Sequence, residues 1–151
     1  MINQSLDGLA VRLQEETAGA AEPDLLTPDS VWNLSQTIQH CAQTIGYSVT
    51  GYPKLKPRAY RATVGALGKR VFLARGRMRH PLGAEIDGAP PLDPALAVTE
   101  AVARLTDAVR RFSAHRSSHA EHPAYGACTH EQFNALHTMH LLEHLPGLAR
   151  D

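Results

Sequence analysis

The sequence predicts an all-α protein, a four-helix bundle with a long crossover between its second and third helices and a short extra helix in that crossover. Apolar residues recur at spacings of three and four in several segments, which is the period of a helix with one buried face. Strict alternation of apolar and polar residues, the pattern of a half-buried strand, does not compete with it. The chain has 151 residues, of which 43% are hydrophobic, so we expect one domain over residues 1–151 with its own core.

The first two helices are expected in the N-terminal third of the chain. Leucines at helical spacing mark the first one, namely Leu6, Leu9 and Leu13. Thr27-Pro28 predicts the start of the second, because threonine is a good N-cap and proline suits the first helical position. That helix is expected to continue to about Val49, shortly before a glycine and a proline.

The last two helices are separated from these by a long connection. Part of residues 54–80 is expected to be helical, and residues 80–93, rich in glycine and proline, are expected to form a loop. Asp93-Pro94 predicts the start of the third helix. Thr129 and Gln132 form a capping box that begins the fourth helix, which ends before Pro146.

Composition and charge disfavour several classes of protein. The formal net charge is zero, whereas a dedicated nucleic-acid binder is usually basic, so nucleic acid is disfavoured as a partner. No stretch approaches the roughly 18 apolar residues of a membrane span, and the N-terminus lacks the pattern of a secretory signal. Cys41 and Cys128 form no CxxC motif. Reduced thiols and a cytoplasmic location are therefore expected.

His140 and His144 on the last predicted helix are the strongest candidates for chemistry. Residues four apart lie on one helix face with their Cβ atoms about 5–6 Å apart. Both histidines fall in the middle of the apolar stripe, at the spacing that lets two imidazoles share a metal ion. His137 lies near the same face and stays an alternative ligand. The competing interpretation is a pair of core histidines held by hydrogen bonds, or an exposed pair at a partner surface.

The second predicted helix has an unusual composition. No residue between Val31 and Pro53 is charged, although a helix with a solvated face normally carries charges there. Its polar residues form a stripe opposite the apolar one: Asn33, Gln36, His40, Gln43 and Tyr47. We interpret this stripe as the lining of an internal cavity, with His40 at its centre and neighbouring amides orienting the ring. The alternative is a solvent-facing stripe that merely lacks charges.

Together, His40, His140 and His144 predict a three-histidine site for a divalent metal. Neutral imidazoles suit Zn²⁺, Ni²⁺ or Fe²⁺, and three of them leave at least one coordination position open. An open position allows the metal to acidify water or a thiol. Glu143 or Tyr47 could then transfer protons. A second group of histidines is expected in a solvated helix end and loop: His115, His119 and His122.

Residues 122–145, HPAYGACTHEQFNALHTMHLLEHL, resemble the C-terminal signature of the DinB-like family of bacterial four-helix bundles, in the branch catalogued as domain of unknown function 1569. The segments IQHCAQTIGYSVTGYP and GKRVFLARGRM resemble it too, so the resemblance extends over most of the chain from Trp32. It implies that His40, His140 and His144 bind a divalent metal, and that the chemistry is metal-dependent, in some relatives through small thiols. Glu143 stands where many relatives carry a further histidine.

The expected function is therefore that of a metal-dependent enzyme, a hydrolase or a small-thiol transferase. The alternative is a non-catalytic bundle whose metal is structural or senses a ligand. The expected partner is a small-molecule substrate, anionic or a low-molecular-weight thiol, and the protein is expected to form a homodimer, as bundles of this size often do.

A basic run bears on the choice of substrate. Residues 54–80 carry nine Lys or Arg and no acid, which favours an anionic ligand. The first candidates to contact such a ligand are Arg58, Arg61 and Lys69. The simpler interpretation is a solvated crossover helix whose charge is balanced by acids elsewhere.

Overall fold

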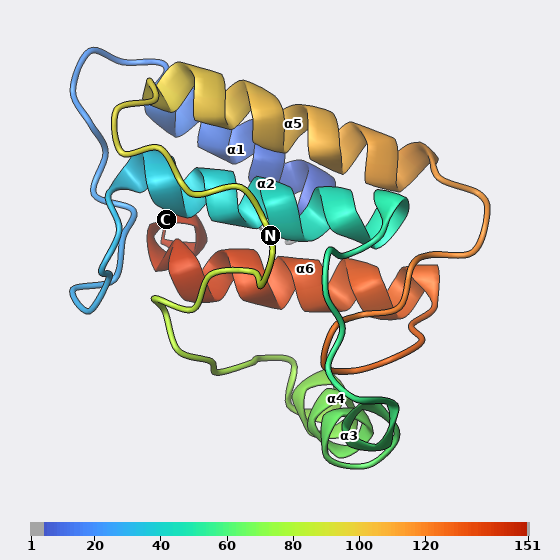
Figure 1. Ribbon diagram of the computed structural model, residues 1–151. Helices are drawn as coiled ribbons and strands as arrows, with labels where there is room; N and C mark the ends of the chain where they lie inside the picture. Colours follow the sequence, from blue (N-terminus) through green and yellow to red (C-terminus); the bar gives the residue numbers. More distant parts are fainter. Residues whose placement is uncertain (1–4, 151) are drawn as a thin grey trace.

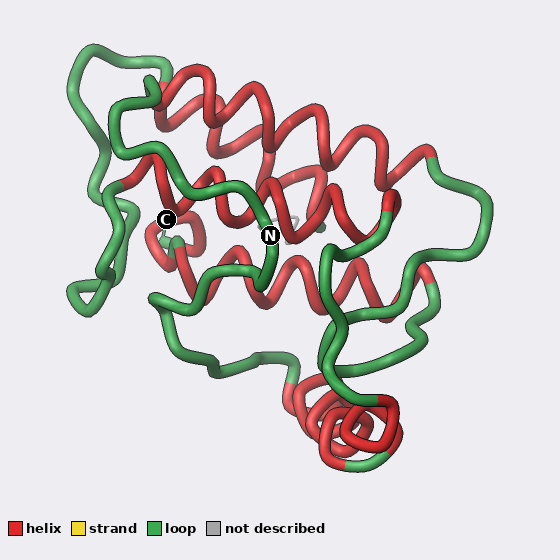
Figure 2. The backbone as a smooth tube through the Cα atoms, viewed as in Figure 1, coloured by secondary structure: helices red, strands yellow, loops and turns green. Residues whose placement is uncertain are grey.

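The structure is a computed structural model that describes residues 5–150 (Figures 1 and 2). The helices are α1 (Leu6–Thr17), α2 (Leu34–Thr50), α3 (Arg58–Ala62), α4 (Val64–Arg75), α5 (Val98–Ala114), α6 (His130–His144) and the 3-10 helix η1 (Pro146–Ala149). In this described part no strand forms, and the one β-bridge joins His122 to Gly126. The prediction of an all-α fold is confirmed.

The four helices α1, α2, α5 and α6 lie side by side around one hydrophobic core (Figure 1). Its fully buried side chains come from all four of them and include Leu9, Leu13, Ile38, Ile45, Leu105, Phe112, Phe133 and Leu141. The α3–α4 pair stands apart from this core, and its one buried residue is Gly65 (Figure 1). Among residues 5–150, no helix has both the length and the apolar character needed to cross a bilayer.

Two of the predicted helix starts are wrong. Residues 27–30 form a turn, and α2 begins later, with Asn33 as its N-cap and Gln36 completing a capping box. Similarly, α5 begins at Val98, because the Asp93 carboxylate accepts the N–H of Ala95 in a turn instead of capping a helix. Cap-forming residues next to proline favour turns as well as helix starts. The capping box at the start of α6 is present as predicted.

The polar face of α2 is covered by the connection that leads into α5. The Gln39 side chain donates to the carbonyl of Asp93 (2.8 Å) and accepts the N–H of the same residue (3.0 Å). Gln43 donates to the carbonyl of Pro90 (3.0 Å). These amides satisfy the backbone of a chain segment without regular structure, which explains why α2 carries no charge. They also hold the connection against α2, and this positions the residues that follow α4.

Candidate metal centre

Four histidine side chains converge between α2, α6 and the connection after α4. His40 comes from α2, His140 and His144 come from α6, and His80 comes from the connection; one ring nitrogen of each lies within 4.8 Å of the other three. Nε2 of His40 is 3.2 Å from Nε2 of His140, and Nε2 of His80 is 3.0 Å from Nε2 of His144. We call these residues the four-histidine cluster.

The spacing of the ring nitrogens fits a single metal ion. With metal–nitrogen distances of about 2.0–2.1 Å, neighbouring donors of a tetrahedron lie about 3.4 Å apart, and opposite donors of an octahedron about 4.2 Å apart. The shortest contacts in the cluster are 3.0 and 3.2 Å, and no donor pair exceeds 4.8 Å. The four histidines are therefore within reach of one ion.

Glu143 fixes the ring of His80. One carboxylate oxygen accepts the backbone N–H of His80 (2.8 Å), and the other lies 2.5 Å from Nδ1 of the same residue. Because a carboxylate accepts, the ring proton is on Nδ1, and Nε2 turns its lone pair towards the cluster. Carboxylates hold metal-binding histidines in this way. Glu143 thus contacts a member of the cluster and is itself a positioning residue.

Desolvation keeps the three helix-borne histidines of the cluster neutral. Burial lowers the pKa of His40 to about 4 and that of His144 to about 3, with mutual repulsion among the rings as a smaller cause. Burial followed by repulsion from His40 and His144 also places the pKa of His140 well below its usual value. Around neutral pH these rings carry no charge, so their nitrogen lone pairs are free to bind a cation.

Trp32 covers one side of the cluster. Its ring centroid is 4.8 Å from that of His40 and is stacked at 5.9 Å from that of His144. Nδ1 of His40 is buried and has no hydrogen-bond partner among residues 5–150. The expectation that amides of α2 orient His40 is therefore wrong, since Gln36 is used in the capping box and contacts with aromatic rings hold the imidazole in place.

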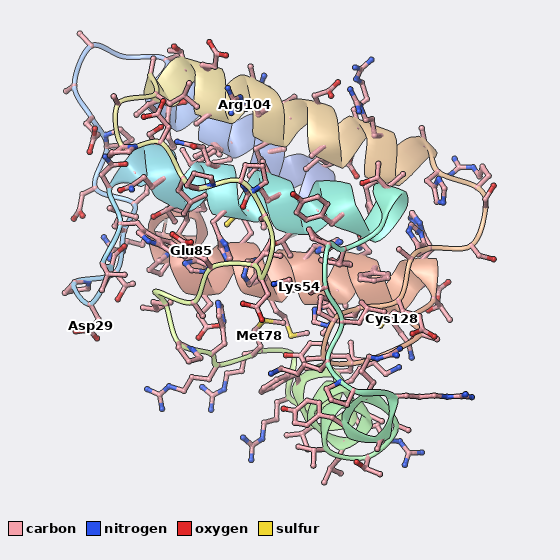
Figure 3. The ribbon with its side chains drawn as sticks, in the orientation of Figure 1. Asp29, Lys54, Met78, Glu85, Arg104 and Cys128 are labelled. Atoms are coloured by element: carbon pink, nitrogen blue, oxygen red, sulfur yellow. The ribbon has the colours of Figure 1, made fainter. Side chains whose placement is uncertain are left out.

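A cavity of about 690 Å³ adjoins the cluster, and His40, His80 and His140 line one part of it. Its other walls are formed by residues 52, 54–57, 78, 81, 84–87 and 122–125, together with Thr44, Leu136 and His137. Three of these residues are labelled in Figure 3: Lys54, Met78 and Glu85. A cavity of this volume is typical of sites that bind small molecules.

Two residues singled out from the sequence do not join the cluster. Tyr47 lines a separate depression formed by α2, α5 and residues 90–91. The cavity is lined by Tyr52 instead, whose hydroxyl donates to the carbonyl of Thr44 (2.8 Å). Nε2 of His137 is 3.0 Å from Oγ of Ser48, so this imidazole is held in the core.

The basic run contributes different residues to the cavity from those expected. Arg61 forms an ion pair with Glu121, and Lys69 donates to the carbonyl of Ala127 (2.7 Å). Neither these two nor Arg58 lines the cavity, whereas the neighbouring residues Lys54 and Lys56 do. Most of the basic run therefore lies in α3, α4 and the chain around them, outside the cavity.

The second group of histidines is only partly solvated. Nε2 of His119 lies 2.9 Å from Nδ1 of His130, a residue at the start of α6. The expectation of a solvated loop is wrong for His122, whose ring lines the cavity and whose pKa is lowered by burial to about 3.

Taken together, the fold and the site define an all-helical protein with four convergent imidazoles beside a cavity. Residues 13–151 match the model of the family described as "Protein of unknown function (DUF1569)", and the chain therefore belongs to the DUF1569 family. This confirms the branch indicated by the sequence resemblance. No curated protein and no solved structure gives a significant match to the chain.

The buried His137 makes stability depend on pH. Its pKa is lowered from 6.5 to about 3 in the folded protein, chiefly by burial, so below pH 6.5 the unfolded chain binds a proton that the folded chain does not. Stability is therefore lost as the pH falls from 6.5 towards 3. In metal-free protein, His137→Gln should reduce this loss by at most about 1.4 kcal/mol per pH unit. Urea unfolding of both proteins at pH 7.5 and 5.0 measures this loss of stability. An identical pH dependence in the two proteins would contradict a lowered pKa for His137.

Proposed function

We propose that the protein binds one divalent transition metal, zinc, nickel or iron, at the four-histidine cluster and acts on a small molecule in the adjoining cavity. The proposed class is a metal-dependent enzyme of the DinB-like type, a hydrolase or a small-thiol transferase. The observation that carries the proposal is the convergence of four imidazoles at the edge of a cavity of about 690 Å³.

The chemistry of the donor set supports this choice of metal. Imidazole nitrogen suits zinc, nickel, iron and copper, whereas magnesium and calcium prefer oxygen ligands. When bound, such a metal supplies Lewis acidity that polarises an oxygen or acidifies a thiol. The chain's own groups shape the site: Glu143 holds His80, and Trp32 shields His40 and His144 from water.

The number of metal ligands distinguishes a structural or sensing form of the proposal from an enzymatic form. Four imidazoles complete a tetrahedron, and this favours a second candidate, a non-catalytic protein whose metal is structural or senses a ligand. A metal with five or six ligands would keep positions free for a substrate. The cavity favours this enzymatic form, because three of the four histidines line it.

The proposal extends to ancestry, location and partners. The packing of α1, α2, α5 and α6 around one core, with candidate ligands on α2 and α6, supports a relationship to DinB-like four-helix bundles. Lys54 and Lys56 in the cavity support an anionic small molecule or a low-molecular-weight thiol as substrate. We also propose that the protein is a cytoplasmic homodimer and that it does not bind nucleic acid.

Removal of one central ligand should abolish metal binding. His140→Ala is expected to lose most of the roughly one equivalent of divalent metal, because the remaining rings no longer surround the ion. Elemental analysis of the purified protein measures this. His115→Ala, which changes a histidine outside the cluster, should retain the metal. Full metal content in His140→Ala would refute the ligand assignment.

The Glu143 carboxylate, which holds His80, should increase the affinity of the site for its metal. Glu143→Gln is expected to weaken metal binding about 10–100-fold, the range seen when such supporting carboxylates are replaced. Competition with a coloured chelator gives the dissociation constant. The matched control is Glu131→Gln, an exposed position on the same helix. An unchanged constant for Glu143→Gln would show that His80 does not bind the metal.

Cobalt substitution distinguishes an open site from a closed one. Four-coordinate Co²⁺ absorbs strongly in the visible region, whereas five- and six-coordinate Co²⁺ absorbs weakly. The enzymatic form predicts weak bands and a new thiolate-to-metal charge-transfer band when cysteine is added, since a thiol would occupy a free position. A strong spectrum that cysteine leaves unchanged would instead establish the structural or sensing alternative.

A further inference from the structure

The loop His122–Gly126 holds an imidazole rigidly at the cavity. Nδ1 of His122 accepts the backbone N–H groups of Ala124 and Tyr125, each at 3.1 Å. Two backbone hydrogen bonds between His122 and Gly126 close the loop, at 2.8 and 3.1 Å. Gly126 has a φ of 74°, a left-handed conformation that favours glycine. The Tyr125 ring stacks on the imidazole at 4.1 Å.

These contacts determine the tautomer of His122. A nitrogen that accepts two N–H groups has no proton of its own, so the proton of the neutral ring is on Nε2. Burial, assisted by the charge of Lys69, lowers the pKa of His122 to about 3, and the ring stays neutral. Its Nε2–H has no hydrogen-bond partner among residues 5–150, and the residue lines the cavity. The loop thus presents a fixed, neutral donor that the protein itself does not use.

The chain beside this loop brings positive charge to the same wall. The backbone N–H of Lys56 donates to the carbonyl of Pro123 (2.9 Å), which holds residues 54–57 against the loop. Lys54 and Lys56 both line the cavity, and neither forms an ion pair within the described part of the chain. The acids that line the cavity, Glu85 and Asp87, come from the connection after α4, and Gly88 of that connection lies beside the Lys54 side chain. One N–H donor and two ammonium groups match an anionic oxygen group such as a carboxylate.

We propose that His122 is a specificity-determining residue whose Nε2–H binds a carboxylate oxygen of the small molecule in the cavity, with Lys54 and Lys56 balancing its charge. Apolar residues in the same cavity favour an apolar body for that molecule: Leu55, Met78, Ile86 and Leu136. The inference rests on the proposed function for the role of the cavity as a substrate site, but the hydrogen bond itself requires no metal.

The test uses benzoate, an apolar ring with one carboxylate, and the full chain freed of metal by a chelator that is then removed. The key variant is His122→Asn, because the asparagine oxygen can accept the same two N–H groups in an Asx turn while the ring N–H is lost. Amide NMR titration should show benzoate binding to the wild type and to His115→Ala, a variant outside the cavity, with similar affinity. Binding to His122→Asn should be weaker by about tenfold or more, and benzylamine should not compete.

Two further measurements make the outcome decisive. Long-range ¹⁵N correlation spectra should show Nε2 of His122 protonated in the free protein and shifted by benzoate. Lys56→Met leaves the loop intact and should also weaken benzoate binding. This variant provides the test if His122→Asn does not fold. Equal affinity in wild type and His122→Asn, or no benzoate binding to the wild type, would overturn the inference. A failure of the metal proposal would appear separately, as wild-type protein that takes up no metal yet binds benzoate.

Discussion

The contact between Glu143 and His80 is the interaction on which the candidate centre depends. The chain between α4 and α5 forms no regular helix over residues 76–97, and ordering each residue of such a segment costs about 1–2 kcal/mol of conformational entropy. Side chains of the helices offset this cost by bonding to its backbone, with Gln39 at Asp93 and Glu143 at His80. The same contacts that order the connection therefore also place the fourth imidazole.

Helix geometry determines which residues of the site can be predicted from the sequence. His140 and His144 are neighbours because they are four residues apart on one helix, and His40 stands out because α2 has no charged residue. His80 lies in an irregular segment, where spacing along the chain implies no position in space. The one available signal was its place in a connection that must cover the uncharged face of α2. Because an uncharged polar face is equally typical of a cavity lining, the pattern does not reveal the chain that covers it.

The fold was predictable to a similar extent and for related reasons. The apolar periodicity of α1, α2, α5 and α6 identifies the class, since burial of one face is what stabilises such helices. Helix starts are less certain, because Thr27-Pro28 and Asp93-Pro94 have the chemistry of caps and of turns alike. Asn33 with Gln36 is the true start of α2, a capping box made of amides in place of the commoner threonine or serine with glutamate.

The division of the four histidines between rigid helices and an irregular connection has a kinetic consequence. Three donors belong to α2 and α6, whose mutual packing opens only when the core is disrupted, whereas His80 belongs to a segment that can detach locally. An ion held here would therefore exchange by losing one donor first, at a rate set by the opening of that segment. Chelators would extract it much faster than the helices unfold, and equilibrium affinity and residence time would be governed by different parts of the chain.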